Sequence, residues 1–517
     1  MHAGYEFIFS REKSLLFLKK KKQKDFYHLV PIPAALGIIV DEELGLSRHP
    51  VPMDRLARLH QGAAELARGN LAEAEITYRG LLAETPTDAE VLSNLGAVYN
   101  TAQCHEAAEA ACRAALAALP GYWAALANLG TALHRQQRFE EATTTYLAAV
   151  RANPRNASAW TNLGVALTEQ GRPAEALPMH DAAVALAPDD AELRTNRAMA
   201  LLSAGDYPRG FAEFEWRWRT PAMAAHRLDG PLWNGEPADP GARTILLHEE
   251  GGFGDTLQFV RFVPAVVARG FHVVLRVQPE LTGLVRRSLP DGVEVISGED
   301  RLPDYDVHSP LLSLPRCFRT NLASVPSQVP YLRPCADRVL RWRARLRSAL
   351  APTCLRVGLV WAGAPRLGMA QMRAMNHRRS IAVARLGKLA GLPGIGFVSL
   401  QHGRDDGDDS LPQGLRIFDP MGEVASFDDT AAIIANLDLV VAVDTAVAHL
   451  AGALAKPVWL LSRYDACWRW VAGRPDSPWY PSLQVCRQPH AGEWDAVLAG
   501  VAQGLAVLGA RGRAGLP

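Results

Sequence analysis

The sequence has few cysteines, and they form no recognisable pattern. No CxxC pair occurs, and no cluster of cysteines and histidines has the spacing of a zinc site. An odd number of scattered thiols is typical of a reducing compartment, so we expect a cytoplasmic protein. The seven cysteines lie at positions 104, 112, 317, 335, 354, 467 and 486.

Excess charge and long hydrophobic runs are also lacking. The 55 Lys and Arg residues against 54 Asp and Glu give a formal net charge of +1, which indicates no bulk attraction to nucleic acid or to a membrane. The apolar stretch 29–40 is too short to span a bilayer and is broken by Pro31 and Pro33. Basic residues precede it, as in a signal peptide, but no cleavage site of small residues is clear. We expect residues 1–54 to be a disordered tail, or a misassigned start with Met53 as the true first residue.

What the sequence does contain, from Arg55 onward, is a repeat of 34 residues. The tripeptide NLG recurs at positions 94, 128 and 162, and each unit reads as two helical patterns with small residues where the helices cross. This period and pattern resemble the tetratricopeptide repeat, which stacks into a superhelix with a concave binding face. We place a repeat domain over 55–224, with units at 55–88, 89–122, 123–156 and 157–190 and a divergent fifth at 191–224.

An asparagine occupies the sixth position of successive units. Its amide offers a donor and an acceptor to a peptide backbone whatever the peptide sequence. The ladder resembles the one that holds acceptor polypeptide in the repeats of O-GlcNAc transferases, and that resemblance implies an acceptor-binding role. The alternative is that each amide only bonds to the adjacent repeat. The four residues are Asn94, Asn128, Asn162 and Asn196.

A chain of 517 residues is too long for one core, and a second region follows the repeats. The Pro- and Gly-rich stretch 225–242 reads as a linker. Beyond it, apolar runs predict strands at 244–248, 273–277, 293–296, 357–361, 396–400, 415–418, 439–443 and 458–461. We divide this region into a Rossmann-like half at 243–335, a connecting helix at 336–355 and a second half at 356–517. An α-solenoid followed by two such halves and a cleft resembles the α/β GT-B fold of nucleotide-sugar glycosyltransferases.

A glycine-rich turn follows the first strand of the first half. Its sequence, HEEGGFGDTLQF, lacks both the GK[ST] of a P-loop and the third glycine of a dinucleotide fingerprint. Gly251, Gly252 and Gly254 let the backbone approach a ligand closely. We expect Asp255 to cap the next helix and to point into the cleft, where its carboxylate could accept a proton from an acceptor hydroxyl. The alternative is that Asp255 is a helix cap and nothing more.

The segment 437–461 reads as strand, turn, helix and strand. We expect Asp444 to be the N-cap of a helix over 445–455, at the carboxyl end of a buried strand. Open α/β sheets bind ligands at such ends, and helix N-termini favour phosphate. Thr445 and His449 are four residues apart and share one face of that helix. The alternative is an ordinary βαβ unit in which Asp444 only caps the helix and His449 is only a polar helix residue.

Four motifs in this order resemble the heptosyltransferase-like glycosyltransferases. They are GGFGDTLQF at 251–259, GLVWAG at 358–363, RRSI at 378–381 and VDTAVAHLAGAL at 443–454. The resemblance implies an inverting transfer of a sugar from a nucleotide-activated donor, with no metal and no cofactor. It implies Asp255 as the general base, and a donor site made by Asp444, Thr445, His449, Arg379 and Gly363.

The donor site departs from the family at one position. Relatives often have a lysine after the first strand of the second half, whereas this sequence offers Arg366, Arg373, Arg378 and Arg379. We choose Arg379 because it belongs to the RS element of related repeat-bearing proteins. Its guanidinium is a fixed cation with a fork suited to phosphate.

Two further signals have ordinary structural explanations. Asp304 and Asp306 form a DxD, a metal motif of another glycosyltransferase fold, but they lie in an apparent short strand. Aromatic side chains near the C-terminal end could stack on a sugar or a nucleobase, or could simply pack in the core. These are Trp468, Trp470, Trp479 and Tyr480.

The combined pattern predicts a glycosyltransferase with two partners, a nucleotide sugar and an acceptor protein or peptide held by the repeats. No nucleic acid and no membrane span are expected. One alternative is a repeat-based scaffold with an inactive transferase-like domain. Another is a transferase for a glycan or lipid acceptor, with repeats that serve assembly. Activity is favoured because an inactive relative would be free to lose the motif residues.

Overall fold

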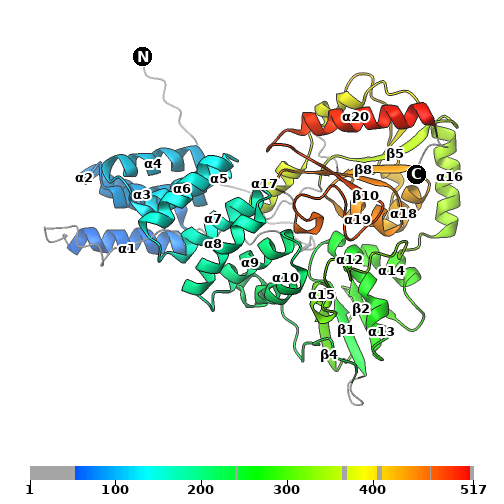
Figure 1. Ribbon diagram of the computed structural model, residues 1–517, viewed down its shortest axis with the longest axis horizontal. Coiled ribbons are helices and arrows are strands. Elements are labelled where there is room, and N and C mark those ends of the chain that lie inside the picture. The colour runs from blue at the N-terminus through cyan, green and yellow to red at the C-terminus, as the bar shows by residue number, and fades with distance from the viewer. Residues whose placement is uncertain are drawn as a thin grey trace, which may run out of the picture.

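The computed structural model describes residues 53–224, 226–238, 243–363, 370–403, 410–465 and 467–512. The expected tail, apart from residues 53 and 54, and part of the expected linker lie outside these ranges. Figure 1 shows a curved array of helices that leads into an α/β region with two sheets. The α-solenoid followed by an α/β region is therefore confirmed. Among the described helices, none has both the length and the apolar character needed to cross a membrane.

Helical hairpins form the repeat array. In the first four hairpins a glycine of the first helix faces a larger side chain of the second: a Cβ at Gly130 would lie 2.6 Å from the ring of Tyr146, and one at Gly62 would lie 2.8 Å from Tyr78. The 34-residue period of glycine is thus a packing requirement. The elements are α1 (Met53–Arg68), α2 (Leu71–Glu84), α3 (Ala89–Thr101), α4 (His105–Ala118), α5 (Trp123–Arg135), α6 (Phe139–Ala152), α7 (Ala157–Glu169), α8 (Pro173–Leu186), α9 (Ala191–Ser203), α10 (Tyr207–Phe214) and the 3-10 helix η1 (Glu215–Arg219).

The first sheet is parallel, with strand order β3-β2-β1-β4. Its strands are β1 (Thr244–His248), β2 (His272–Val277), β3 (Glu294–Ser297) and β4 (Val307–Pro310). The sequence predicts the first three. For the fourth it expects only a short strand around Asp304 and Asp306, but β4 begins at Val307, after both aspartates, in a stretch where histidine, serine and proline interrupt the apolar pattern. Asp306 lies just before β4, where its carboxylate accepts the backbone N–H groups of Arg243 and Thr244 at 2.8 Å, so this half of the DxD has a structural role.

The second sheet is also parallel, with strand order β10-β9-β8-β5-β6-β7. Its strands are β5 (Leu355–Val360), β6 (Ile395–Ser399), β7 (Ile417–Phe418), β8 (Leu439–Val443), β9 (Val458–Ser462) and β10 (Leu483–Arg487). The sequence analysis misses only β10, an edge strand that carries the exposed Gln484. The strand order reverses between β5 and β8, and ligands of open α/β sheets bind outside the carboxyl ends of strands at such a switch point.

A buried aspartate ties the connecting helix to the second half. The helix α16 (Ala336–Ala349) packs beside α18 (Phe427–Ala435). From α18, the carboxylate of Asp429 accepts hydrogen bonds from Arg338 at 2.6 Å, Arg341 at 2.7 Å and the indole of Trp342 at 3.1 Å. The side chain of Asp429 is only 1% exposed. Three donors of one helix therefore converge on one charged acceptor.

The last repeat shares a hydrophobic core with both sheets. Tyr207 and Phe211 of α10 lie in the same buried cluster as strand residues from β1 and β8. The indole N–H of Trp479 donates to the hydroxyl of Tyr207 at 3.0 Å, and Trp468 makes an edge contact with Phe211. Trp468, Trp470, Trp479 and Tyr480 are at most 1% exposed, so the structural explanation of these aromatic residues holds.

Candidate functional site

The turn after β8 presents the N-terminus of a helix. The helix α19 runs over Ala446–Ala453, shorter than expected, and its N-cap is Thr445, whereas the sequence analysis places Asp444 there. Thr445 adopts the extended conformation of an N-cap, with φ −140° and ψ 170°, while Asp444 belongs to the preceding turn. The hydroxyl of Thr445 makes no cap hydrogen bond. Its Oγ1 atom is buried and has no hydrogen-bond partner among the described residues.

Arg379 reaches this turn from the neighbouring strand connection. It ends α17 (Ala370–Arg379), which follows β5. Its Nη1 donates to the carbonyl of Asp444 at 3.2 Å, and its Nε donates to Asn376 at 2.9 Å. A Cβ at Gly363 would overlap the guanidinium of Arg379 and the amide of Asn376, so only glycine leaves room for them. Four of the five expected donor residues therefore lie together at the switch point, namely Gly363, Arg379, Asp444 and Thr445.

His449, the fifth, lies one turn into α19 and is 4% exposed. Its ring stacks on Trp470 with centroids 5.3 Å apart, and Nδ1 hydrogen-bonds the hydroxyl of Tyr480 at 3.0 Å. Burial, with the nearby positive charges of Arg469 and Arg261, lowers the pKa of His449 well below its usual value. The imidazole is therefore neutral at physiological pH, and it acts as a hydrogen-bonding group rather than as a cation.

The glycine-rich turn of the first half faces this helix. α12 (Phe253–Phe259) lies beside α19, and a Cβ at Gly254 would stand 3.0 Å from Cδ2 of His449. The N-cap of α12 is Gly252, not Asp255 as expected from the sequence. Asp255 is the third residue of the helix, and its Oδ2 accepts the backbone N–H of Gly252 at 2.8 Å. The aspartate still caps the helix, but it does so from the third helical position, where its side chain accepts the backbone N–H of the N-cap residue.

The sequence analysis misses Arg469, which pairs with Asp255. The Nη2 of Arg469 donates to Oδ1 of Asp255, its Nε donates to Gln258 at 2.7 Å, and the side chain is 4% exposed. Burial acts to lower the pKa of Arg469, but the charge of Asp255, with lesser contributions from Cys467 and Asp444, raises it overall. The available signal is its place in the tripeptide WRW, since a charged residue between two core tryptophans needs a buried partner.

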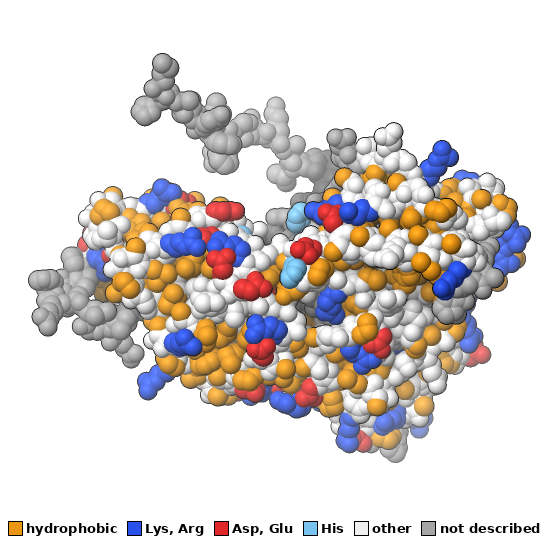
Figure 2. Space-filling view, turned by 45° about the horizontal axis from the view of Figure 1, so that its top comes forward, with side chains coloured by type: hydrophobic (Ala, Val, Ile, Leu, Met, Phe, Trp, Pro, Cys, Tyr) orange, Lys and Arg blue, Asp and Glu red, His pale blue; other side chains and the backbone are white. Residues whose placement is uncertain are grey.

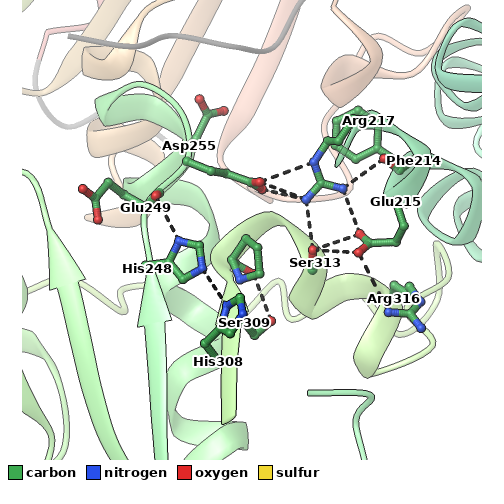
Figure 3. Close-up of polar contacts among 12 residues, drawn as sticks. Phe214, Glu215, Arg217, His248, Glu249, Asp255, His308, Ser309, Ser313 and Arg316 are labelled. Carbon is green, nitrogen blue, oxygen red and sulfur yellow. Dashed lines mark hydrogen bonds and ion pairs between the residues drawn. The ribbon is translucent and has the colours of Figure 1, made fainter. Parts of the chain in front are cut away.

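A second polar cluster joins the last repeat to the glycine-rich turn. Arg217 of η1 donates to Glu250 at 2.9 Å, and these two side chains are 3% and 2% exposed. Figure 3 shows Arg217 held from the other side by Glu215 and Ser313. Below them His248 and His308, on β1 and β4, meet at 3.2 Å between Nε2 and Nδ1. Burial lowers the pKa of His248 to about 3 and also lowers the pKa of His308, so both rings are neutral at physiological pH.

The asparagine ladder lies inside the repeat array, where all four side chains are buried. Asn128 donates to the carbonyl of Ser93 in the preceding repeat at 3.0 Å, as the structural alternative expects. The amide of Asn196, and the amide oxygen of Asn94, have no hydrogen-bond partner among the described residues. The four positions therefore differ: at least one amide is used between repeats, while two retain unused hydrogen-bonding capacity.

Within the described ranges, no three His, Cys, Asp or Glu residues come together in a way that could hold a metal ion.

The other arginine candidates for the donor site are only partly visible. Arg366 lies outside the described residues, as does the side chain of Arg373. Arg378 is described, and it pairs with Asp465 at 3.2 Å.

Comparison with known proteins finds relatives of both the repeat region and the α/β region. Residues 43–89, 135–179 and 169–215 match the tetratricopeptide repeat family, and residues 415–487 match glycosyltransferase family 9 (heptosyltransferase). FlbA of Caulobacter vibrioides is 27% identical over 331 residues, which cover 59% of this chain and 53% of that protein. The chain thus spans about half the length of the curated relative that it matches.

Two solved structures show partial similarity. One is PilF of Pseudomonas aeruginosa, with a TM-score of 0.30 and 24% identity, over 34% of this chain and 78% of that one. The other is TTC0263, a tetratricopeptide protein of Thermus thermophilus, with a TM-score of 0.31 and 24% identity, over 33% and 94%. The family matches, rather than these structures, place a segment similar to glycosyltransferase family 9 after the tetratricopeptide repeats.

Proposed function

We propose that this chain, in which tetratricopeptide repeats precede a family 9 glycosyltransferase domain, transfers a sugar with inversion from a nucleotide-activated donor to an acceptor hydroxyl. In this reaction the acceptor oxygen bonds to the anomeric carbon as the bond to the nucleoside diphosphate breaks. The acceptor proton passes to a base, and the diphosphate leaves with an added negative charge. The protein must therefore supply a base and a site for that charge.

The observation that carries the proposal is the turn after β8. The N-terminus of α19 offers backbone N–H groups, Thr445 offers a buried hydroxyl with no partner in the described part of the chain, and Arg379 offers a cation. Together they suit the diphosphate of the leaving group, because positive helix ends and fixed donors stabilise developing negative charge. We propose that these groups balance the negative charge of the leaving diphosphate without a metal ion. Neutral His449 adds a hydrogen-bonding group to the same helix face.

Asp255 is the proposed base. It lies at the start of α12, on the first-half side of the contact between Gly254 and His449, so a base and a diphosphate site adjoin each other across the two halves. All seven cysteines are free thiols, which supports a reducing compartment such as the cytoplasm, where we place the enzyme.

The acceptor is a protein or peptide held by the repeats. The match to tetratricopeptide repeats supports this assignment, because stacked repeats form a concave surface for a partner, whereas the ladder asparagines are buried within the array. Figure 2 shows the surface indented where the repeats meet the α/β region, with histidine and charged side chains around the indentation. The bond from Asn128 to Ser93 shows that at least this ladder amide is used for packing between repeats.

Calorimetry tests the donor site directly. We expect UDP, GDP or ADP to bind to the full chain in the presence of EDTA. We expect Arg379→Gln to weaken that binding by about tenfold to a hundredfold, because a hydrogen bond to a charged group contributes about 1.5–3 kcal/mol. Failure of all three nucleotides to bind would remove the basis of the donor-site assignment.

The glycine before α17 offers a steric test of the same site. We expect Gly363→Ala to weaken nucleoside diphosphate binding, because the added methyl group overlaps the guanidinium of Arg379 and must displace it. A matched control is Gly422→Ala, since no atom lies within 4 Å of a Cβ at that glycine and its φ is not positive. Equal affinities of the two variants in calorimetry would contradict the placement of Arg379 in the donor site.

A further inference from the structure

The segment that follows β9 contacts both the repeats and the proposed site. Trp468 packs against Phe211 of the last repeat, with ring centroids 5.6 Å apart. Two residues later, Trp470 stacks on His449. Between the two tryptophans, Arg469 extends to the glycine-rich turn of the first half. One short segment therefore joins the repeats, the donor helix α19 and the proposed base.

Arg469 is held in a fixed orientation. Nη1 lies 3.3 Å from Sγ of Cys467, Nε donates to Gln258, and the guanidinium lies 4.5 Å from the ring centroid of Trp468. The remaining donor, Nη2, reaches Asp255. Because the contacts with Cys467, Gln258 and Trp468 fix the plane of the guanidinium, they also fix the direction in which Nη2 donates. The carboxylate of Asp255 therefore has little freedom to rotate.

The charge of Arg469 matters as much as its position. The side chain of Asp255 is 14% exposed, and a carboxylate with so little water gains a proton readily unless a cation lies beside it. A protonated carboxyl group cannot take the proton of an acceptor hydroxyl. Asp444 from the donor turn also interacts electrostatically with Arg469, so this one cation is shared between the two halves of the site.

We infer that Arg469 is a positioning residue for the proposed transfer: it holds Asp255 ionised and aimed, and the last repeat fixes Arg469 through Trp468. This inference rests on the proposed function, in which Asp255 is the base. It adds a residue outside the expected motifs, and it gives the repeats a second role in addition to acceptor binding, because they support the catalytic carboxylate.

The experiment follows the protonation of Asp255 itself. Full-length protein labelled with ¹³C-aspartate is titrated by NMR, and the signal of Asp255 is assigned by its absence in Asp255→Asn. We expect Arg469→Met to shift the protonation of this carboxyl group upward by about one to three pH units. We expect Arg469→Lys, which keeps the charge but loses the fork, to shift it upward by about half a unit. A matched control is Arg474→Met, which breaks an exposed pair with Asp476 and should leave the signal unmoved.

Turnover provides the second readout. Hydrolysis of UDP-glucose, GDP-mannose and ADP-glucose is followed as released nucleoside diphosphate, over the same pH range. We expect the acid limb of kcat to move with the NMR titration in Arg469→Met, while the donor KM changes less than about threefold.

The outcomes separate the two proposals. An unmoved Asp255 signal in Arg469→Met overturns the inference, even where nucleotides bind and turnover continues. Absence of nucleotide binding in the unmodified protein overturns the proposed function, while the NMR titration still decides whether Arg469 governs Asp255. If Arg469→Met does not fold, the lysine variant decides, and a shift of zero in that variant counts against the inference.

Discussion

Asp255→Asn is expected to lower the rate of sugar transfer by about 10²- to 10⁴-fold, the usual contribution of a positioned general base. Asparagine keeps one oxygen, which can still accept from the backbone N–H of Gly252, whereas the contact that the other oxygen of Asp255 makes with Arg469 is lost. It cannot take a proton from the acceptor. Because Asp255 lies outside the turn after β8, the affinity for nucleoside diphosphate should change by less than about threefold. Turnover measured by diphosphate release, with calorimetry for binding, separates these two effects.

A matched control for this variant is Asp476→Asn. Asp476 is 58% exposed and pairs with Arg474, so the variant removes one negative charge from an ion pair away from the site. We expect it to retain full turnover. Turnover of Asp255→Asn equal to that of the control would exclude Asp255 as the base. A parallel loss of binding and turnover would instead mean that the variant disturbs the donor site.

Asp429→Ala is expected to lower the free energy of unfolding by about 3 kcal/mol. The variant removes a charged acceptor from Arg338, Arg341 and Trp342, and it leaves the buried indole N–H of Trp342 unpaired. The two arginines are partly exposed and regain water, which keeps the loss below that of a fully buried pair. Urea denaturation at pH 7 measures the difference, and Asp291→Ala, at an exposed position, should change stability by less than about 0.5 kcal/mol.

The effect of Asp429 should depend on pH. Burial alone would raise the pKa of Asp429, but the hydrogen bonds from Arg338 and Trp342 lower it overall. A carboxyl group whose folded pKa is depressed stabilises the protein fully above its unfolded value, near 3.9, and loses that contribution as the pH falls through the folded value. The stability difference between the protein and Asp429→Ala should therefore be constant from about pH 8 to 5 and shrink below about pH 4. A difference independent of pH would mean that Asp429 acts by packing alone.

Local patterns predict most of the fold because they reflect local physics. The 34-residue period marks glycines such as Gly130, where the facing Tyr146 leaves no room for a Cβ. Continuous apolar runs mark strands that are covered on both faces, as in β8. The pattern fails at the edges of sheets, where β4 and β10 mix polar and apolar residues. It also fails by one residue at the α19 N-cap, since Asp444 and Thr445 are both suitable cap residues and only the path of the chain decides between them.

The candidate site is less predictable, because its key contacts join distant parts of the chain. Sequence motifs single out Asp255 and Thr445, but nothing near Asp255 in the sequence indicates that Arg469, 214 residues later, pairs with it. The neutrality of His449 follows from its burial under Trp470, which no local pattern reveals. Whether the motif residues perform the proposed roles stays a prediction.

The shared core of the last repeat and the two sheets has a consequence for how such proteins diversify. Helices α1 to α4 stack in series with their neighbours, so units can be exchanged there most freely, whereas Phe139 of α6 already stacks on Tyr464 of the α/β region with ring centroids 5.9 Å apart. Tyr207 and Phe211 of α10 cannot be exchanged so freely, since Trp468 and Trp479 would lose their cover. The unit that must change together is therefore the α/β region with the later repeats that pack on it, and the more variable part is the array that precedes them.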